Sequence, residues 1–230
     1  MQPRNLYLRL FLQTVVWLAI MAAILFAAAG NARWPQAWVF VALFAISSAG
    51  FGAWLGWRDP GLLAARLAPP VQQGQPLWDK VFLIVFILIW LGWLALMGLD
   101  ARRWQTSHMP AWLNGLGLAL VIGGFLAVLR VFRENSFAAP VVRVQNERAQ
   151  RVIDTGPYAI VRHPMYAGAL LYLFGMPLLL VSWYGLLAVP LMILGLAPRA
   201  VMEERVLKRD LPGYANYMAR VHYRLIPYVW

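Results

Sequence analysis

The sequence has no cysteine and few charged residues. The absence of cysteine excludes disulfides, thiolate-bound metals and a cysteine nucleophile within these 230 residues. Charged residues make up 13% of the chain, against roughly 25% in an average soluble domain, whereas hydrophobic residues make up 62%. The mean hydropathy is +0.62. This composition indicates an all-α integral membrane protein that crosses the bilayer several times.

Histidine and acidic residues are also scarce. The three histidines, His108, His163 and His222, are far apart and match no zinc-binding spacing, so the sequence implies no metal. Lys and Arg outnumber Asp and Glu by 20 to 9, and in a soluble chain this net charge of +11 would suggest a nucleic-acid partner. Here the basic residues cluster at the ends of apolar runs, where anionic lipid head groups and topology explain them. We therefore expect no nucleic-acid binding.

Six apolar runs are long enough to predict membrane-spanning helices. The first exceeds the roughly 7–15 residues of a signal-peptide core and has Arg4 and Arg9 at its start, so we expect an uncleaved anchor. Pro190 and Pro198 should kink the sixth run. The short turn Ser182–Tyr184 makes the last two runs an antiparallel hairpin. The six runs are Leu8–Gly30, Gln36–Trp57, Val81–Leu99, Trp112–Val131, Met165–Val181 and Gly185–Val201.

Two polar segments separate some of these runs. Arg58–Trp78 is rich in proline and contains a short amphipathic stretch, Leu62–Leu67, which suits the membrane surface. Phe132–Thr155, here called the connector, is too polar to span a bilayer, and we expect it to lie across one face of the bundle, where loops often complete sites. The chain accordingly divides into a four-span bundle, residues 1–131, and a second region, residues 132–230.

Small residues are frequent in the second and fourth runs. They let helices approach closely, and this packing role is the favoured interpretation. Four of the glycines could instead border a lateral opening through which a lipophilic ligand enters from the bilayer. The small residues are Ser47, Ser48, Gly50, Gly52, Gly115, Gly117, Gly123 and Gly124. The four that could border a lateral opening are Gly50, Gly52, Gly123 and Gly124.

The distribution of basic residues predicts the orientation. With six spans, all but three of the 20 Lys and Arg residues fall on one face, and the three exceptions are Arg33, Arg102 and Arg103. The positive-inside rule then places both termini in the cytoplasm. We expect an integral protein of a bacterial inner membrane with its polar connector and tail on the cytoplasmic side.

The stretch DTGPYAIVRHPMYAG, Asp154–Gly168, carries the densest polar and aromatic signal. Gly-Pro could be a plain turn, and Arg162 with His163 could merely face lipid phosphates. We favour a functional interpretation because each polar side chain at a membrane boundary needs a partner or water. Pro164 suits the first position of a helix, which puts His163 at the N-cap and free amides at the membrane rim, an anion site. Tyr158, Arg162, Tyr166 and Gly168 would then surround this helix start and hold a carboxylate and an aromatic base.

A pair of glutamates should meet this stretch. Glu203 lies 20 residues after Trp183, about 30 Å of helix and one hydrocarbon thickness, so Glu203 and Glu204 reach the depth of His163. Adjacent helical residues point in different directions, so at least one carboxylate should face the bundle, where ionisable groups usually have a function. The alternative is a solvated salt bridge between Glu204 and Lys208.

Two motifs together carry a family resemblance. GPYAIVRHPMYAG, followed about 35 residues later by EERVLKRDLPGYANYMARVHYRLIP, resembles the C-terminal signature of the isoprenylcysteine carboxyl methyltransferases, which are related to the phospholipid N-methyltransferases. The resemblance covers Glu134–Pro227, and residues before Val131 match only as generic spans. It implies an S-adenosylmethionine-dependent methyltransferase that binds its cofactor through His163, Tyr166 and the glutamate pair.

The chemistry of methyl transfer narrows the roles. It needs in-line positioning and a deprotonated nucleophile, but no metal. A carboxylate acceptor is already ionised and needs only an orienting cation, for which Arg220 and Arg224 are candidates. Together with Glu204 they form the predicted catalytic set, although either arginine could simply contact lipid phosphate. An amine or thiol acceptor would need a base. Other residues in this region are assigned to packing, namely Tyr214, Tyr217 and Val221, or left as possible site residues, namely Asn135 and Glu147.

Several functions remain open at this stage. Carboxylate O-methylation of a lipophilic acceptor taken from the bilayer leads, and phospholipid, amine or thiol methylation follows. An NADPH-dependent enzyme like the sterol reductases ranks lower, because GPYAIV stands where a Gly/Trp-rich segment is expected. A transporter or scaffold is disfavoured because ionisable residues cluster at one rim rather than in mid-bilayer.

Overall fold

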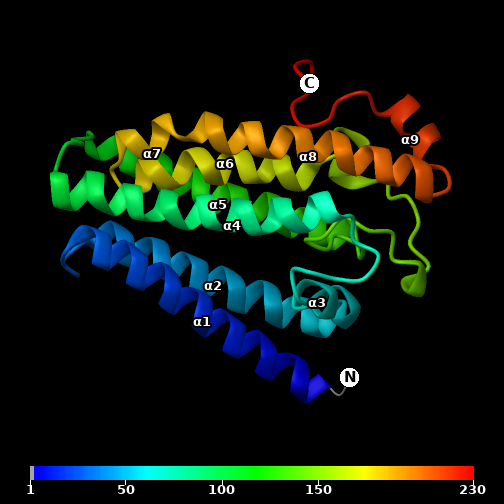
Figure 1. The fold of residues 1–230 in the computed structure, drawn as a ribbon, viewed down its shortest axis with the longest axis horizontal. Helices are drawn as coiled ribbons and strands as arrows, with labels where there is room; N and C mark the ends of the chain where they lie inside the picture. Colours follow the sequence, from blue (N-terminus) through cyan, green and yellow to red (C-terminus); the bar gives the residue numbers. More distant parts are fainter. Residues whose placement is uncertain (1–2) are drawn as a thin grey trace.

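The computed structural model describes residues 3–230, and Met1 and Gln2 lie outside the described residues. Within that range all regular secondary structure is helical (Figure 1). The long helices are α1 (Pro3–Ala29), α2 (Pro35–Arg58), α4 (Leu77–Gly98), α5 (Ala111–Glu134), α6 (Pro164–Leu179) and α8 (Val189–Asp210). The short elements are α3 (Pro60–Arg66), α7 (Trp183–Leu187), α9 (Tyr214–Arg220), a π-helical turn (Leu99–Trp104) and two 3-10 turns (Asn146–Arg148 and Gly156–Ala159).

All six predicted apolar runs are helical. Five helical stretches are long and apolar enough to cross a membrane: Asn5–Ala29, Pro35–Arg58, Leu77–Trp104, Ala111–Glu134 and Trp183–Asp210. The predicted all-α integral membrane fold is thereby confirmed. The fifth run, α6, has only 16 residues, or about 24 Å of helix, which is shorter than the roughly 30 Å hydrocarbon core.

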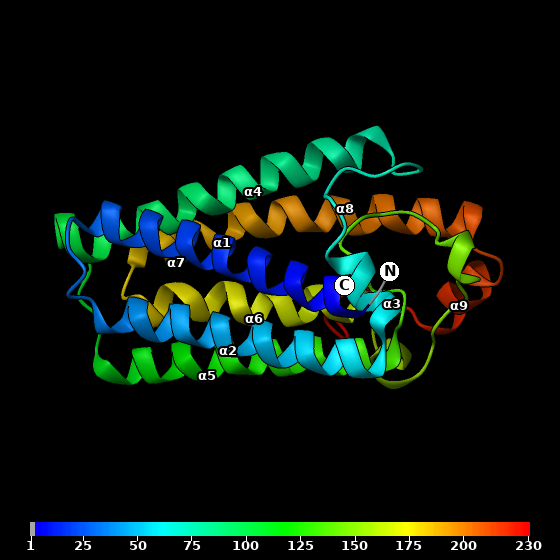
Figure 2. The same cartoon turned by 90° about the horizontal axis from the view of Figure 1, so that it is seen from below.

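Helix α6 packs closely along α5 (Figures 1 and 2), and glycines make this possible. A Cβ added at Gly117 would lie 2.8 Å from the carbonyl oxygen of Gly175, and one added at Gly124 would lie 3.0 Å from that of Gly168. Both distances are too short for a side chain, so the two backbones touch. The packing role predicted for Gly117 and Gly124 is confirmed, and Gly168 shares it.

The packing prediction fails at other small residues. Gly50 and Gly115 have no atom within 4 Å of an added Cβ, so they face open space, and Gly123 has only an ordinary contact with Leu171. Gly52, by contrast, is buried and packs closely against the Leu10 side chain of α1, so the packing prediction is confirmed there. Hydropathy and composition alone do not say which side of a lipid-facing helix a glycine occupies.

The chain breaks before α8, so Pro190 does not kink a continuous helix as predicted. Helix α7 ends at Leu187, Ala188 caps the next helix, and Pro190 lies in the first turn of α8. Proline suits that position because the first amides of a helix have no intrahelical partner. Pro198 stays inside α8, which continues to Asp210, beyond the predicted end at Val201.

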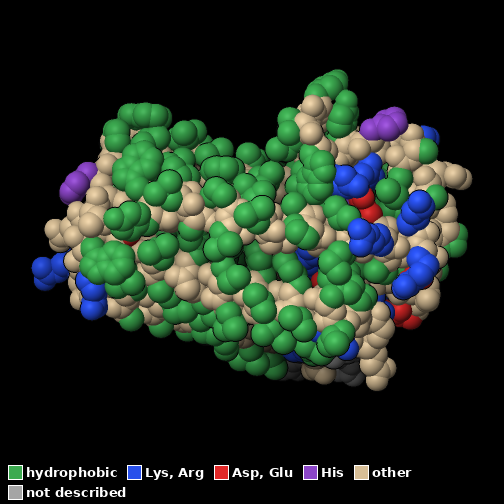
Figure 3. Space-filling model, turned by 45° about the horizontal axis from the view of Figure 1, so that its top comes forward, with side chains coloured by type: hydrophobic (Ala, Val, Ile, Leu, Met, Phe, Trp, Pro, Cys, Tyr) green, Lys and Arg blue, Asp and Glu red, His purple; other side chains and the backbone are tan. Residues whose placement is uncertain are grey.

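One end of the molecule collects the polar elements. Helix α3, the connector, α9 and the C-terminus lie together there, at the right of Figure 1, and we call this the polar end. Figure 3 shows Lys and Arg side chains gathered at this end, whereas hydrophobic side chains cover the length of the helices. The opposite end, called the far end, holds the turns around residues 30–34, 105–110 and 180–182. There Arg102 Nη2 donates to the carbonyl oxygen of Arg33.

The predicted amphipathic stretch is α3. Its Leu62 and Leu63 are buried against α1, α2 and α5, while Asp59 caps its start by accepting a hydrogen bond from the Leu62 amide at 2.8 Å. The apolar face of α3 thus packs against the helices at the polar end of the bundle.

Candidate functional site

A cavity of about 120 Å³ opens at the polar end, and we call it the polar cavity. Its walls come from the connector, the start of α6, the end of α8 and α9. Five of the predicted cofactor-binding residues line it: Tyr158, Arg162, His163, Tyr166 and Glu203. The structure therefore brings together predicted side chains from two separate parts of the chain, the stretch Asp154–Gly168 and the glutamate pair.

Pro164 begins α6 as predicted, with His163 at the N-cap. The His163 side chain makes no capping hydrogen bond, so its ring is available to other partners. The backbone amides of Arg162 and His163 each donate at 2.9 Å to carbonyls of the tail, those of Tyr223 and Arg224. The motif and the tail are thus held side by side.

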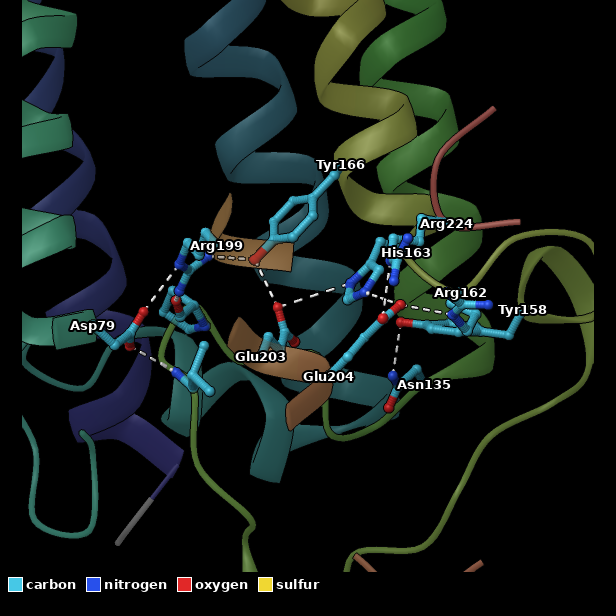
Figure 4. Close-up of polar contacts among 12 residues, drawn as sticks. Asp79, Asn135, Tyr158, Arg162, His163, Tyr166, Arg199, Glu203, Glu204 and Arg224 are labelled. Atoms are coloured by element: carbon cyan, nitrogen blue, oxygen red, sulfur yellow. Dashed lines mark hydrogen bonds and ion pairs between the residues drawn. The ribbon is translucent and has the colours of Figure 1, made fainter. Parts of the chain in front are cut away.

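Glu204 is the buried centre of a cluster of positive groups (Figure 4). It is 3% exposed, and its Oε1 accepts a hydrogen bond from Arg162 Nε at 2.6 Å and lies 3.2 Å from His163 Nε2. Its Oε2 accepts from Arg224 Nε at 2.9 Å. Glu204 thus makes its contacts within this cluster, and the alternative surface pair with Lys208 does not form. Glu204 does not line the polar cavity, so it positions the groups that do.

Glu203, by contrast, faces the polar cavity. Its side chain is 25% exposed, and its Oε2 accepts a hydrogen bond from the Tyr166 hydroxyl at 2.8 Å. The Tyr166 ring stacks on His163, with ring centroids 5.3 Å apart and planes 9° apart. One glutamate of the pair is therefore buried in ion pairs, and the other presents a carboxylate to the cavity.

Two charged residues beyond the predicted set complete this arrangement. Arg199 on α8 donates to the Tyr166 hydroxyl, and its Nε pairs at 2.9 Å with Asp79 of α4, which is fully buried (Figure 4). Asp79 also accepts from the backbone amide of Val142 at 2.9 Å, and Arg199 donates to the carbonyl oxygen of Pro140 at 2.7 Å. The pair thereby ties the connector to two spans. Arg199 lies inside the predicted sixth span, and a charge within a span is itself a functional signal.

Tyrosines form the other side of the cavity. Asn135 Nδ2 donates to the Tyr158 hydroxyl at 2.7 Å, and the Tyr217 hydroxyl donates to the Tyr158 carbonyl oxygen at 2.8 Å. Burial raises the pKa of Tyr158 and of Tyr217, so both remain neutral phenols. The predicted packing of Tyr214, Tyr217 and Val221 is confirmed, since they form one apolar cluster, yet both tyrosines also line the cavity.

Other predicted residues lie elsewhere. Arg220 is 65% exposed and pairs at 2.6 Å with Asp154, away from the polar cavity, while Arg224 pairs with Glu204. Glu147 is 55% exposed and pairs with Arg143. Among the residues that the structure describes, no three His, Asp or Glu side chains cluster as a metal site would require.

The structure is that of an integral membrane protein, and its C-terminal half is similar in sequence to known methyltransferases. Residues 112–212, from α5 to the end of α8, match the family model described as phospholipid methyltransferase. The chain is also 26% identical over 113 residues to Protein-S-isoprenylcysteine O-methyltransferase B of Arabidopsis thaliana. This alignment covers 48% of the chain and 57% of the relative, so the chain spans just over half the length of that protein. The predicted resemblance to the isoprenylcysteine carboxyl methyltransferases and the related phospholipid methyltransferases is confirmed.

Proposed function

We propose that this protein is an S-adenosylmethionine-dependent methyltransferase that acts on a lipophilic acceptor, with O-methylation of a carboxylate as the favoured reaction. The observation that carries the proposal is the polar cavity, where Glu203, Tyr158 and Tyr166 converge at the membrane end of α6 and α8. The match of this same region to methyltransferases supports the reaction class.

The residues that line the polar cavity fit the groups of this cofactor. Glu203 offers an accessible carboxylate for the ammonium group, and the rings of Tyr158, Tyr214 and Tyr217 suit the flat base. Arg151 lines the cavity, is exposed and has no carboxylate partner within salt-bridge distance among the described residues, so it suits the cofactor carboxylate. When bound, the cofactor supplies an electrophilic methyl group on its sulfonium.

The state of His163 favours an acceptor that needs no base. The histidine is 6% exposed, and its two ring nitrogens face Glu204 at 3.2 Å and Glu203 at 3.8 Å. Its Nε2 is held by the buried Glu204 and its ring is almost fully buried, so it is poorly placed to deprotonate an amine or thiol. A carboxylate is already ionised at neutral pH, so positioning suffices.

The connector has to move when the cofactor binds. The polar cavity measures about 120 Å³, whereas ligand pockets are typically about 300–1,000 Å³. Residues 137–143 and 150–153 form one wall, and they are loop segments outside the helices. An outward shift of these segments would admit a nucleoside from the water side. By the distribution of Lys and Arg, that side is the cytoplasm, with both termini there.

The test is equilibrium binding of S-adenosylmethionine and of NADPH to the purified protein in detergent. We expect binding of S-adenosylmethionine only, weakened about tenfold or more in Glu203→Gln, because a charged hydrogen bond contributes about 1.5–3 kcal/mol. Glu147→Gln is the matched control, since that carboxylate is exposed and outside the cavity. Transfer of a labelled methyl group into a lipid extract then identifies the acceptor. Binding of NADPH, or of neither nucleotide, would contradict the proposal.

A further inference from the structure

Arg66, the last residue of α3, differs from the other inward-facing arginines of the polar end. Arg162 and Arg199 each pair with a carboxylate, at 2.6 Å and 2.9 Å. Arg66 has no carboxylate within salt-bridge distance among the described residues. Its Nη1 donates to the carbonyl oxygen of Ala138 at 2.8 Å, and its guanidinium lies 4.5 Å from the centroid of the Phe132 ring.

The surroundings of Arg66 make this lack of a counter-ion significant. The side chain is half-buried, and burial lowers its pKa to about 10, so the group is still charged at neutral pH. Removing a charge from water is costly unless it is paired. One neutral carbonyl and one aromatic face compensate only part of that cost. An anion beside Arg66 would compensate the rest.

Arg66 borders a cavity of about 480 Å³ between the membrane-spanning helices, which we call the apolar chamber. Its volume falls within the range of about 300–1,000 Å³ for ligand sites. The lining is mainly apolar, with a few hydroxyl and amide groups and one cation, Arg66. The lining side chains are Leu10, Gln13, Thr14, Trp17 and Met21 of α1, Phe44, Ser47, Ser48, Phe51 and Leu55 of α2, Leu63 and Arg66 of α3, Leu67, Trp90 of α4, and Phe125, Val128 and Phe132 of α5, together with Gly52.

The apolar chamber adjoins the polar cavity through a short wall of the connector. Ala138 accepts the hydrogen bond from Arg66 and also lines the polar cavity. Pro140 lines the polar cavity and also a further cavity of about 450 Å³, which shares Arg66, Gln13 and Trp17 with the apolar chamber. Residues 138–140 therefore separate Arg66 from the proposed methyl-transfer site.

We propose that the apolar chamber binds a lipophilic carboxylate, with the apolar tail between α1, α2 and α5 and the carboxylate on Arg66. A guanidinium matches a carboxylate in geometry as well as in charge. A tail that moves from the bilayer into the chamber exchanges one apolar environment for another, so the head group decides which lipid is retained. This inference rests on the proposed function only in naming this ligand as the acceptor.

The probes for this site are three amphiphiles with the same chain, namely oleate, oleyl alcohol and oleyl phosphate. Binding is measured with the full chain in nanodiscs of zwitterionic lipid. We expect oleate to bind about tenfold more tightly than the alcohol, as one charged hydrogen bond would provide. In Arg66→Gln the two should bind alike, at the affinity of the alcohol. Ser48→Trp fills the chamber and should weaken both equally.

Arg133→Gln is the matched control, because Arg133 lies at the same end but is exposed and outside the chamber. It should change neither affinity. Unchanged preference for oleate in Arg66→Gln, or full affinity in Ser48→Trp, would overturn the site, and a preference for oleyl phosphate would overturn the carboxylate. S-adenosylmethionine binding is measured on the same samples: nucleotide binding without oleate binding refutes this site alone, whereas oleate binding without nucleotide binding refutes the proposed function alone.

Discussion

The two ends of the molecule each contain a buried carboxylate, but they satisfy it with different donors. At the far end, Asp100 accepts hydrogen bonds from the hydroxyls of Ser107 at 2.7 Å and Ser182 at 2.6 Å, and from the Thr106 hydroxyl and the Tyr184 amide. At the polar end, Glu204 faces Arg162, Arg224 and His163. The first cluster is made of neutral donors, whereas the second contains the charges of two arginines.

We propose that the difference separates a structural cluster from one that serves a binding site. Oδ2 of Asp100 accepts three hydrogen bonds and Oδ1 accepts one, all from donors in the turns that they join, which fixes those turns. The charges around Glu204 instead position His163 and, through it, the neighbouring cavity-facing carboxylate of Glu203. Charges held close together and partly exposed are typical of binding and catalytic sites.

The largest effect is expected from removing one charge of the polar cluster. Arg162→Leu leaves Glu204 with fewer partners in a site that is 3% exposed, and breaking a buried pair in this way costs about 3–5 kcal/mol. We expect a clear fall in the unfolding midpoint in detergent and loss of S-adenosylmethionine binding. Arg209→Gln is the control, because its pair with Asp210 is exposed and such pairs add little to stability. Equal midpoints for the two variants would contradict the buried role of Arg162.

A second comparison sets Asp79 against Asp100, since both are fully buried. Asp79→Asn removes the counter-ion of Arg199, which holds the Tyr166 hydroxyl beside Glu203. We expect cofactor affinity to fall about tenfold, as for one misplaced charged hydrogen bond, with the KM of the acceptor less affected. Asp79 acts through Arg199 and is thus a positioning residue.

Asp100→Asn serves as the matched variant for Asp79. It should lower the unfolding midpoint, because hydrogen bonds to a charged acceptor are weakened, and leave the cofactor affinity unchanged. If both variants lose affinity to the same extent, the effect of Asp79 is a general loss of folding and not positioning.

A third comparison concerns movement at the two ends. Because the polar cavity is smaller than a nucleoside requires, we expect the connector to shift outward on cofactor binding. The sequence has no cysteine, so spin labels can be placed at Glu147→Cys and Lys208→Cys without background. The distance between these labels should lengthen when S-adenosylmethionine is added. Labels at the exposed far-end residues Arg33 and Trp112 should report no change; movement there, or none at the connector, would contradict this expectation.

Local rules of sequence predicted much of the candidate site. Proline at a helix start placed Pro164 and His163, and the rise per residue of a helix placed Glu203 at the same depth. Hydropathy likewise predicted the spans, because length and apolarity suffice to identify them. These features depend on residues close together in the chain or on one straight helix.

The features that sequence did not predict depend on residues far apart. Asp79 and Arg199 are separated by 120 positions, and Arg66 and Ala138 by 72, so no spacing rule relates them. Nor could composition tell that Pro190 would begin a helix or that Gly50 would face outward, since both outcomes depend on which neighbours surround the helix. Only the charge of Arg199 inside a predicted span was a signal of this part of the site.

The smallest effect is expected from removing the charge of Arg220. Comparing this effect with that of Arg66→Gln decides which cation orients the acceptor. From its charge and its place in the tail, Arg220 is a candidate for this role, yet its side chain is 65% exposed and pairs with Asp154 outside the polar cavity. An exposed pair contributes about 0–1 kcal/mol. Arg220→Gln should therefore change the folding equilibrium constant and kcat/KM each by less than about fivefold. Arg66→Gln in the same assay should raise the KM of a lipophilic carboxylate about tenfold, because among the described residues it removes the only charge that lines the apolar chamber. A larger loss in kcat for Arg220→Gln than for Arg66→Gln would assign the orienting cation to the tail and place the acceptor carboxylate on the water side of the connector.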